Sequence, residues 1–252
     1  MSLCRILPMA LLLLALTAGK ALAENLVVFG DDGYAPVIYV HEGKAAGVLP
    51  AIFARLAKDT GDTYELVLMP WKRALEESMA GRGGITNISL TQERARLYDF
   101  SEPIYHDDIQ LVVLQGREFL FTELKDLKNK LVGGGAGASY GNEVDQAIAA
   151  GVFSVQRDPG QISRMRKLLA GRVDVAIVGN GSAGLEHILK SDPQLAAKRT
   201  LFVALPKPLV RDPLYLAFAK SMEKKAAIER FNKALLALKK TAEYRQLISG
   251  RK

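Results

Sequence analysis

The hydrophobic positions of this chain follow two alternating patterns. Short, continuously apolar runs are typical of buried strands, whereas apolar residues that recur every three to four positions are typical of helices. The strands predicted in the first half are 26–29, 37–40, 64–69, 85–90 and 109–114. Between them, helices are predicted to start at Pro50 and at Trp71, and to end before Gly61 and Gly81 because glycine commonly follows a helix.

The second half repeats this alternation. Its predicted strands are 131–133, 153–156, 173–178, 201–205 and 214–219. Its predicted helices are 142–149, 162–169, 222–238 and 242–248. A regular exchange of strands and helices predicts an α/β fold whose sheets are mostly parallel.

The two alternating blocks predict two lobes. One lobe combines residues 24–112 with 206–252, and the other spans 113–205. Because no linker rich in Gly, Ser or Pro separates the blocks, we expect two crossing strands to join the lobes. The expected hinge segments are Val112–Gln115 and Val203–Pro206, which are extended and lie where the block pattern changes.

Residues 1–23 have the pattern of a secretory signal peptide. Arg5 precedes an apolar run from Ile6 to Ala18, and Ala21-Leu22-Ala23 is a cleavage site with small outer residues. No later stretch approaches the roughly 20 apolar residues that cross a bilayer. The sequence therefore predicts a soluble, exported protein located in the periplasm.

Composition excludes several classes of function. The only cysteine is Cys4, so the predicted mature chain has no disulfide framework, thiolate metal site or cysteine nucleophile. The three histidines are far apart in the sequence, and no metal site or other cofactor is predicted. The lysines near the C-terminus alternate with apolar residues at helical spacing. They predict a solvated helix face and no nucleic-acid partner.

The most informative polar run extends from Thr86 to Arg94. Small polar residues leave a predicted strand and lead into a short helix that Ser89 or Thr91 can cap. Arg94 then falls in the first turn, where the helix dipole disfavours a cation unless an anion lies opposite. That anion is either a bound carboxylate or a neighbouring side chain, Glu93 or Asp99, and the spacing alone leaves both open.

A glycine-rich run, Gly133 to Ala138, lies between a predicted strand and helix. With Asp158 further on, it imitates a dinucleotide-binding fingerprint. However, so many small residues fit several registers of that motif by chance, and an exported compartment offers little dinucleotide. Alternatively, backbone N–H groups around Ser139, Tyr140 and Gly141 bind an anion.

The run Ser89 to Arg94, followed by Asp99 to Tyr105, resembles the signature of family 3 extracellular solute-binding proteins. Four further segments resemble the family in the expected order: 33–36, 47–57, 170–174 and 214–220. The resemblance implies a two-lobed periplasmic binding protein fold. It also implies a monomeric receptor that closes around a small carboxylate-bearing ligand, an amino acid or close relative, and delivers it to an ABC transporter permease.

The resemblance further implies roles for individual residues. Arg94 would bind the ligand carboxylate together with Thr86, Asn87 and Ser89. Tyr34 would cover the ligand. The other residues expected at the ligand are Asp31, Trp71, Ser139, Tyr140 and Asn180.

One position departs from the family pattern. Amino-acid receptors usually carry an acid for the ligand ammonium where this chain has Gly179, and the amide of Asn180 lacks a carboxylate's charge. Three sources of a displaced acid remain open, namely Asp31, Glu143, or Asp107 with Asp108, as does a ligand without an α-amine.

The enzymatic alternative is a cyclohexadienyl dehydratase-like protein on the same fold, acting on prephenate or arogenate. In that interpretation Glu143 is the general acid.

Overall fold

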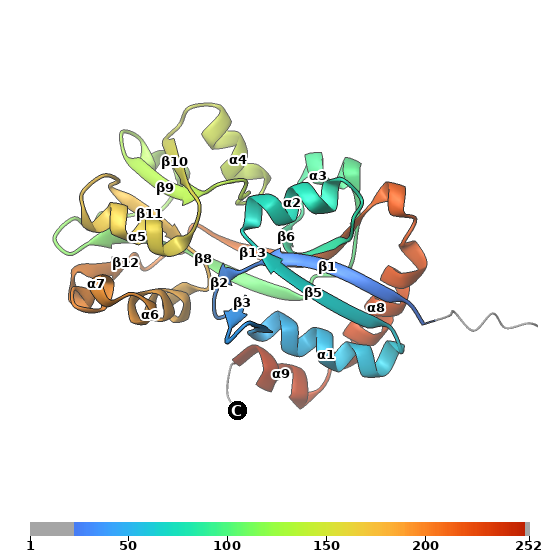
Figure 1. The fold of residues 1–252 in the computed structure, drawn as a ribbon. Coiled ribbons are helices and arrows are strands. Elements are labelled where there is room, and N and C mark those ends of the chain that lie inside the picture. Colours follow the sequence, from blue (N-terminus) through green and yellow to red (C-terminus); the bar gives the residue numbers. More distant parts are fainter. Residues whose placement is uncertain (1–22, 250–252) are drawn as a thin grey trace, which may run out of the picture.

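The computed structural model describes residues 23–249. The predicted signal peptide therefore lies outside the described residues, except for Ala23. Figure 1 shows two groups of strands and helices joined by two long strands, β8 (Tyr105–Leu114) and β13 (Val210–Ala219). The predicted α/β class is confirmed.

One sheet runs through both lobes in the order β10-β9-β11-β8-β13-β6-β1-β5. Its remaining strands on this path are β1 (Asn25–Asp31), β5 (Thr63–Met69), β6 (Gly84–Ser89), β9 (Leu131–Gly135), β10 (Ser154–Asp158) and β11 (Val175–Val178). Pairing is parallel within β10-β9-β11 and within β6-β1-β5, and antiparallel from β11 through β8 and β13 to β6. The fold is therefore two parallel blocks on either side of an antiparallel central pair.

The other strands are short. They are β2 (Gly33–Tyr34), β3 (Ile38–His41), β4 (Lys44–Ala46), β7 (Tyr98–Phe100) and β12 (Phe202–Ala204). Strands β2, β3 and β4 form a separate small sheet, while β7 pairs with β13 and β12 with β8.

Helices cover both faces of each parallel block. Those of the first lobe are α1 (Val48–Thr60), α2 (Trp71–Met79), α3 (Gln92–Leu97), α8 (Lys225–Leu238) and α9 (Ala242–Ser249). Those of the second lobe are α4 (Asn142–Ala149), α5 (Gln161–Leu169), α6 (Gly181–Ser191) and α7 (Pro193–Ala196). Three short 3-10 turns are η1 (Leu124–Leu127), η2 (Arg199–Leu201) and η3 (Lys220–Met222). Each lobe thus buries a hydrophobic cluster on both faces of its sheet.

The two crossing strands pass from one core to the other. Ile104 and Leu214 are buried in a first-lobe cluster, whereas Ile109 belongs to a second-lobe cluster. Val112 and Leu209 also lie in second-lobe clusters, so the second core extends beyond the predicted limits of 113–205. Apolar alternation identifies a buried strand, but it does not show which of two adjacent cores the strand packs against.

Both crossing strands also start about four residues before their predicted first residues, Ile109 and Leu214. Polar residues interrupt each apolar run, and a proline such as Pro213 normally argues against a central strand. In the structure these two polar segments pair with each other, Asp212 opposite Asp107 and Pro213 opposite His106. Helix α1 likewise begins at Val48 rather than at Pro50.

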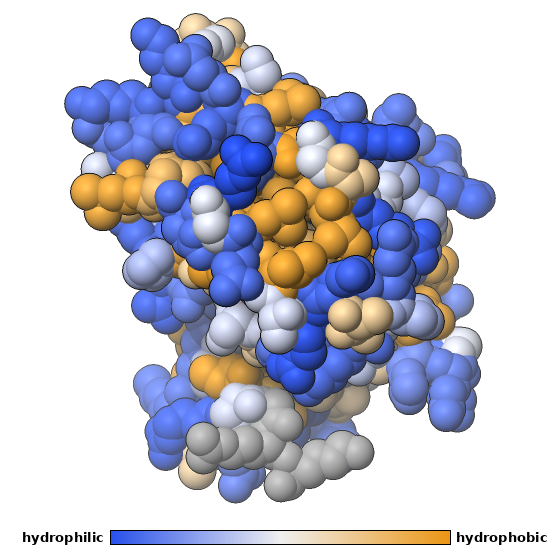
Figure 2. All heavy atoms as spheres, turned by 90° about the vertical axis from the view of Figure 1, so that its left-hand side faces the viewer, coloured by the Kyte–Doolittle hydropathy of each residue, from blue (hydrophilic) through white to orange (hydrophobic). Residues whose placement is uncertain are grey.

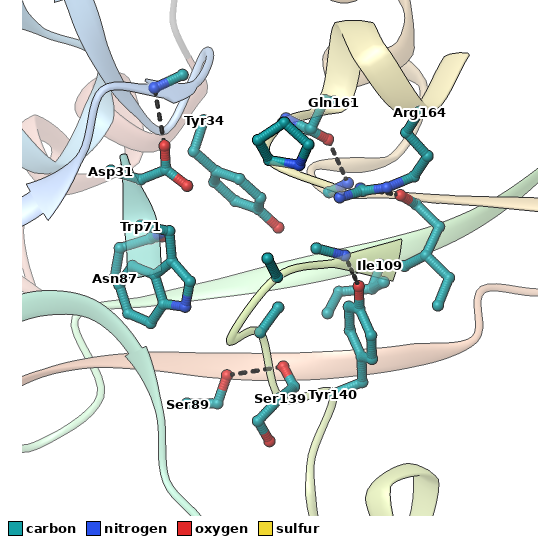
Figure 3. A pocket seen from close by; sticks show the side chains of 18 of the residues that line it. Asp31, Tyr34, Trp71, Asn87, Ser89, Ile109, Ser139, Tyr140, Gln161 and Arg164 are labelled. Atoms are coloured by element: carbon teal, nitrogen blue, oxygen red, sulfur yellow. Dashed lines mark hydrogen bonds between the residues drawn. The ribbon is translucent and has the colours of Figure 1, made fainter. Parts of the chain in front are cut away.

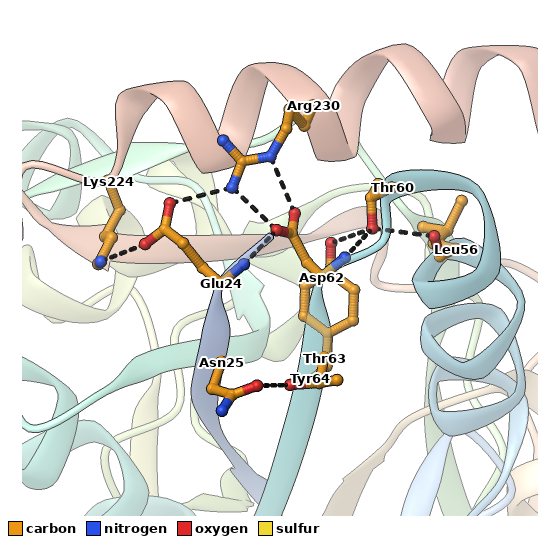
Figure 4. Close-up of polar contacts among 9 residues, drawn as sticks. All are labelled: Glu24, Asn25, Leu56, Thr60, Asp62, Thr63, Tyr64, Lys224 and Arg230. Atoms are coloured by element: carbon orange, nitrogen blue, oxygen red, sulfur yellow. Dashed lines mark hydrogen bonds and ion pairs between the residues drawn. The ribbon is translucent and has the colours of Figure 1, made fainter. Parts of the chain in front are cut away.

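A polar cluster fixes the end of the first lobe away from β8 (Figure 4). The Arg230 guanidinium of α8 donates to both carboxylate oxygens of Asp62, at 2.9 and 3.1 Å, and to Glu24 at 2.9 Å. The backbone N–H of Glu24 also donates to Asp62, at 2.9 Å. The cluster therefore joins the start of β1, the α1–β5 turn and α8.

The surface seen from the second-lobe side is mainly hydrophilic and surrounds a central apolar area (Figure 2). Within residues 23–249, no helix has the length and apolar character needed to cross a membrane. Hydrophobic helix faces in this part of the chain instead pack on the sheets.

Asp62→Ala is expected to lower the free energy of unfolding by about 3 kcal/mol, because the change leaves part of a buried ion pair without its partner. Asp62 is 1% exposed. The matched control is Asp59→Ala, which removes an exposed partner of Arg55 and should change stability by less than about 0.5 kcal/mol. Urea unfolding of both variants measures this, and equal losses would contradict it.

Candidate ligand-binding site

A cavity of about 320 Å³ lies between the lobes (Figure 3). The first lobe and its crossing strands line it with Asp31, Asp32, Gly33, Tyr34, Trp71, Asn87, Ser89, Arg94, Asp212 and Leu214. The second lobe and its end of β8 contribute Ile109, Gly135, Ala136, Ala138, Ser139, Tyr140, Pro159, Gly160, Gln161, Ile162, Ser163, Arg164, Ile177 and Gly179. This volume is at the lower end for ligand pockets, so it suits one small molecule.

Arg94 is the central cation of this cavity. Thr91 caps α3 by accepting a hydrogen bond from the Arg94 backbone N–H at 3.1 Å, which places Arg94 in the first turn. The side chain donates to the carbonyl of Ser89 at 3.0 Å and to the carbonyl of Gly137, in the second lobe, at 3.2 Å. The guanidinium also lies 5.9 Å from the centre of the Trp71 ring.

No carboxylate lies within ion-pair distance of Arg94 among the described residues. Asp99, one of the two neighbours considered above, instead pairs with Lys220 at 2.8 Å, and Glu93 is exposed. Arg94 itself is only 9% exposed, and burial lowers its pKa. Backbone carbonyls accept from two of its five N–H donors without neutralising its charge, so a bound anion would gain both hydrogen bonds and charge compensation.

The end of β6 brings three of the predicted residues close to Arg94. Asn87 has a left-handed backbone (φ 62°) and lines the cavity, and its side-chain oxygen has no hydrogen-bond partner among the described residues. The Ser89 hydroxyl donates to Asp212. Thr86 is fully buried and does not line the cavity, although its hydroxyl oxygen also lacks a partner.

Tyr34, Trp71 and Asp31 also line the first-lobe wall (Figure 3). The Tyr34 hydroxyl donates to Asp107, and its pKa is raised by burial and by that carboxylate. The Trp71 indole N–H donates to the Gly137 carbonyl at 3.1 Å, across the lobes. Asp31 accepts from the Gly33 N–H at 2.8 Å, and burial raises its pKa to about 6.

Ser139 and Tyr140 line the second-lobe wall, but several of their polar groups are already occupied. The Tyr140 N–H donates to Asp145 at 3.0 Å, and the Gly141 N–H donates to the Ser139 hydroxyl at 3.2 Å. The Tyr140 hydroxyl accepts from the Gly135 N–H at 2.8 Å. Of the backbone donors expected to bind an anion here, those of Tyr140 and Gly141 are therefore bonded within the protein.

The glycine-rich run has a packing role. A Cβ on Gly133 would lie 2.9 Å from an Arg164 side-chain carbon, and one on Gly134 would lie 2.9 Å from the Tyr140 hydroxyl. Arg164 forms a buried ion pair with Asp158 at 3.1 Å. Asp158, the acid of the apparent dinucleotide-binding fingerprint, is thus the ion-pair partner of Arg164. The glycines leave room for the side chains of Arg164 and Tyr140.

The structure shows why residue 179 has no side chain. A Cβ at Gly179 would lie 1.8 Å from the Tyr34 hydroxyl oxygen, so the phenol occupies that space. The neighbouring Asn180 does not line the main cavity. Its side-chain oxygen accepts from the Tyr105 hydroxyl, and it borders a second depression next to α9.

The acids considered for the ligand ammonium differ in where they lie relative to the cavity. Asp108 is exposed and pairs with Arg211 at 3.6 Å, and Glu143 is exposed on α4 outside the cavity lining. Asp107 is fully buried behind Tyr34, and burial raises its pKa to about 6. Of the acids considered from the sequence, Asp31 alone is in the cavity lining.

Several cavity residues were not predicted, among them Asp212 and Gln161. Asp212, on β13, is 4% exposed, and burial raises its pKa to about 7. Gln161, at the start of α5, accepts from the Gly179 N–H at 3.1 Å, and its side-chain nitrogen has no partner within residues 23–249. In the sequence, the Asp-Pro pair after Arg211 is typical of a turn, and no other candidate binding residue lies next to Gln161. Local sequence therefore does not indicate that either side chain lies at a ligand site.

Fold and cavity together define a two-lobed binding protein with its site between the lobes. The model for bacterial extracellular solute-binding proteins, family 3, matches residues 26–250, and this chain belongs to that family. It is a solute-binding receptor of the kind that serves ABC transporters in amino-acid uptake.

Individual relatives agree with this assignment. The L-cystine-binding protein TcyJ of Escherichia coli (strain K12) is 29% identical over 188 residues, which cover 73% of this chain and 69% of TcyJ. The probable amino-acid-binding protein YxeM of Bacillus subtilis (strain 168) is 24% identical over 89% of this chain and 83% of YxeM. A solved ancestral arginine-binding protein bound to glutamine has a TM-score of 0.71 and 25% identity, and the match covers 90% of this chain and 96% of that one.

These comparisons support a receptor rather than the dehydratase alternative. The position of Glu143 agrees, because an exposed carboxylate outside the cavity cannot act as a general acid on a ligand held there.

Proposed function

We propose that this protein captures a free α-amino acid whose carboxylate binds Arg94. The observation that carries the proposal is a buried guanidinium in a small cavity, bonded to carbonyls of both lobes and paired with no carboxylate in the described chain. A ligand carboxylate at this point would form charge-assisted hydrogen bonds and would offset the cost of burying the Arg94 charge.

The charges of the cavity favour a ligand with a positive net charge. Asp31, Asp32 and Asp212 line it, whereas Arg94 is the one lining cation among residues 23–249 without an acidic partner, since Arg164 is paired with Asp158. After the ligand carboxylate has neutralised Arg94, the acids remain to receive an ammonium and a cationic or hydrogen-bond-donating side chain. Arginine and lysine fit this pattern, and glutamate and aspartate do not. Cystine, the ligand named for one relative, carries two ammonium groups.

Binding is coupled to closure of the lobes. Trp71 and Arg94 of the first lobe both donate to the Gly137 carbonyl of the second, and Gln92 donates to Asn142 at 3.0 Å. A ligand that contacts both walls adds to these contacts and shifts the population toward the closed form. The proposed hinge is the segment in which β8 and β13 pair between the two cores, 105–109 with 210–214.

The closed form would then deliver its ligand to an ABC permease, after export guided by residues 1–23. Both walls of the cavity belong to a single chain, which supports action as a monomer.

Thermal unfolding with a panel of ligands tests the proposed class. A ligand that binds only the folded state stabilises it by about 2.7 kcal/mol at 100 times its Kd. We expect L-arginine or L-lysine to raise the unfolding temperature most, L-glutamine and L-cystine to give smaller or equal shifts, and L-glutamate and succinate to give none. A larger shift with glutamate or succinate would contradict the charge argument.

Arg94→Ala is expected to weaken binding of the best amino acid by roughly 2 to 5 kcal/mol, as for the loss of a buried charge partner. Arg94→Lys should restore only part of this, because one ammonium cannot reproduce the planar two-donor fork. Arg96→Ala, an exposed arginine on the same helix, is the matched control and should bind normally. Calorimetric titration measures all three, and unchanged affinity in Arg94→Ala would refute the proposed carboxylate site.

Gly179→Ala is expected to weaken binding of the same amino acid at least tenfold, because the added Cβ meets the Tyr34 hydroxyl when the lobes are closed. Gly160→Ala provides the control, since Gly160 lines the same cavity and has open space around its Cβ position. Equal affinities of the two variants would show that Tyr34 does not approach Gly179 in the bound form.

A further inference from the structure

Asp212 is a buried acid that the capture of a carboxylate does not use. It lines the cavity from β13 and is 4% exposed. Its one hydrogen-bond partner in the described chain is the Ser89 hydroxyl, and no cation of that part of the chain lies within ion-pair distance. Burying a carboxylate in this way is costly unless a positive charge joins it.

The surroundings of Asp212 do not supply that charge. The charged groups that act on it are Asp107 and Asp145, which are acidic, and Arg94, which is directed to the carbonyls of Ser89 and Gly137. Burial is the main reason that the pKa of Asp212 rises to about 7. A cation entering the cavity would therefore gain more at Asp212 than at a solvated acid.

Ser89 places this acid next to the carboxylate site. Its backbone carbonyl accepts from the Arg94 guanidinium at 3.0 Å, and its hydroxyl donates to Asp212. Ser89 thus contacts both the Arg94 guanidinium and the Asp212 carboxylate, which therefore lie close together in the cavity. An α-amino acid carries its carboxylate and its ammonium on the same carbon, so its two charged groups match this arrangement.

Asn87 supplies a second acceptor in the same wall. It is two residues before Ser89 on β6, it is 8% exposed, and its side-chain oxygen has no partner in the part of the chain that the structure describes. A bound ammonium has three donors, and an ionised acid, an amide oxygen and the serine hydroxyl together can accept them.

We propose that Asp212, with the side-chain oxygen of Asn87, binds the α-ammonium of the ligand. This inference rests on the proposed function, since it assumes that the carboxylate of the same ligand binds Arg94. In this arrangement an acid on β13 binds the ligand ammonium. A side chain at position 179 cannot do so, because Tyr34 occupies the space there. Asp107 is a poorer candidate because its carboxylate already accepts from Tyr34 and from the Asn180 N–H.

The test compares each amino acid with its deaminated analogue by calorimetric titration. The pairs are L-arginine with 5-guanidinopentanoic acid, L-glutamine with 4-carbamoylbutanoic acid, and L-cystine with 3,3′-dithiodipropionic acid. The pair used is the one whose amino acid binds the wild-type protein most tightly. The variants are Asp212→Asn and, as a matched control, Asp108→Asn, an exposed acid on the paired strand.

We expect the wild-type protein to bind the amino acid about 10- to 100-fold more tightly than its analogue, the scale of a hydrogen bond to a charged group. In Asp212→Asn this preference should fall to about threefold or less, chiefly through weaker binding of the amino acid, while affinity for the analogue should change by less than about threefold. Asp108→Asn should behave as the wild type.

The pH dependence gives a second readout that a purely structural role would not change. A protonated Asp212 cannot pair with an ammonium, so affinity of the wild type for the amino acid should rise from pH 5.5 to pH 8 as this carboxyl loses its proton. The rise should be smaller in Asp212→Asn and for the deaminated analogue.

Three results would overturn the proposal: equal binding of amino acid and analogue by the wild type, equal losses for both in Asp212→Asn, or an unchanged preference in that variant. The first comparison needs no variant, so it decides the point even if Asp212→Asn fails to fold. Failure of the proposed function is distinct, because then no amino acid of the panel binds the wild type, or Arg94→Ala binds normally.

Discussion

The site depends on keeping one guanidinium buried without a carboxylate partner. Arg94 lies in a helix of six residues, and burial disfavours its charge. Thr91 caps the helix, the carbonyls of Ser89 and Gly137 take up two of its donors, and Trp71 packs nearby. Because Gly137 belongs to the second lobe, the lobes must meet for this arrangement to exist. Such a costly position is expected at a functional site.

The topology explains why polar groups gather at this point. In sheets with parallel blocks, ligands bind outside the carboxyl ends of the strands, where the strand order changes. Asp31 ends β1, Ser89 ends β6, Gly135 ends β9, and Gly179 follows β11. All four line the cavity, on either side of the central strands β8 and β13. Asp212 joins them because the pairing of β13 with β8 places it opposite Asp107, inside the molecule.

The elements of the fold could be predicted because each has a local signal. Helix 142–149 matches its predicted bounds, and most of the predicted strands are present with small shifts at their ends. Arg94 could be identified for the same reason, since a helix-capping residue and a cation in the predicted first helical turn lie within a few residues of each other. Asp212 could not, because its burial follows from pairing with a strand about 100 residues away, and the adjacent proline suggests a turn.

Asn180 is a residue that the sequence places at the ligand and the structure does not. It follows a cavity strand, as a ligand residue would, but its left-handed backbone leaves its side chain in contact with Tyr105, bordering a different depression. The glycine run of β9 likewise allows two interpretations from the sequence, whereas in the structure Arg164 fills the space beside Gly133. Both outcomes depend on contacts between distant segments, which a single sequence does not encode locally.

A crystal structure of the protein with its tightest-binding amino acid is the most direct test of the central claim. The account predicts that the ligand carboxylate lies within hydrogen-bonding distance of both terminal nitrogens of Arg94, with the α-ammonium between Asp212 and Asn87. A ligand whose carboxylate lies away from Arg94, while the Arg94 guanidinium keeps its bonds to Ser89 and Gly137, would contradict it.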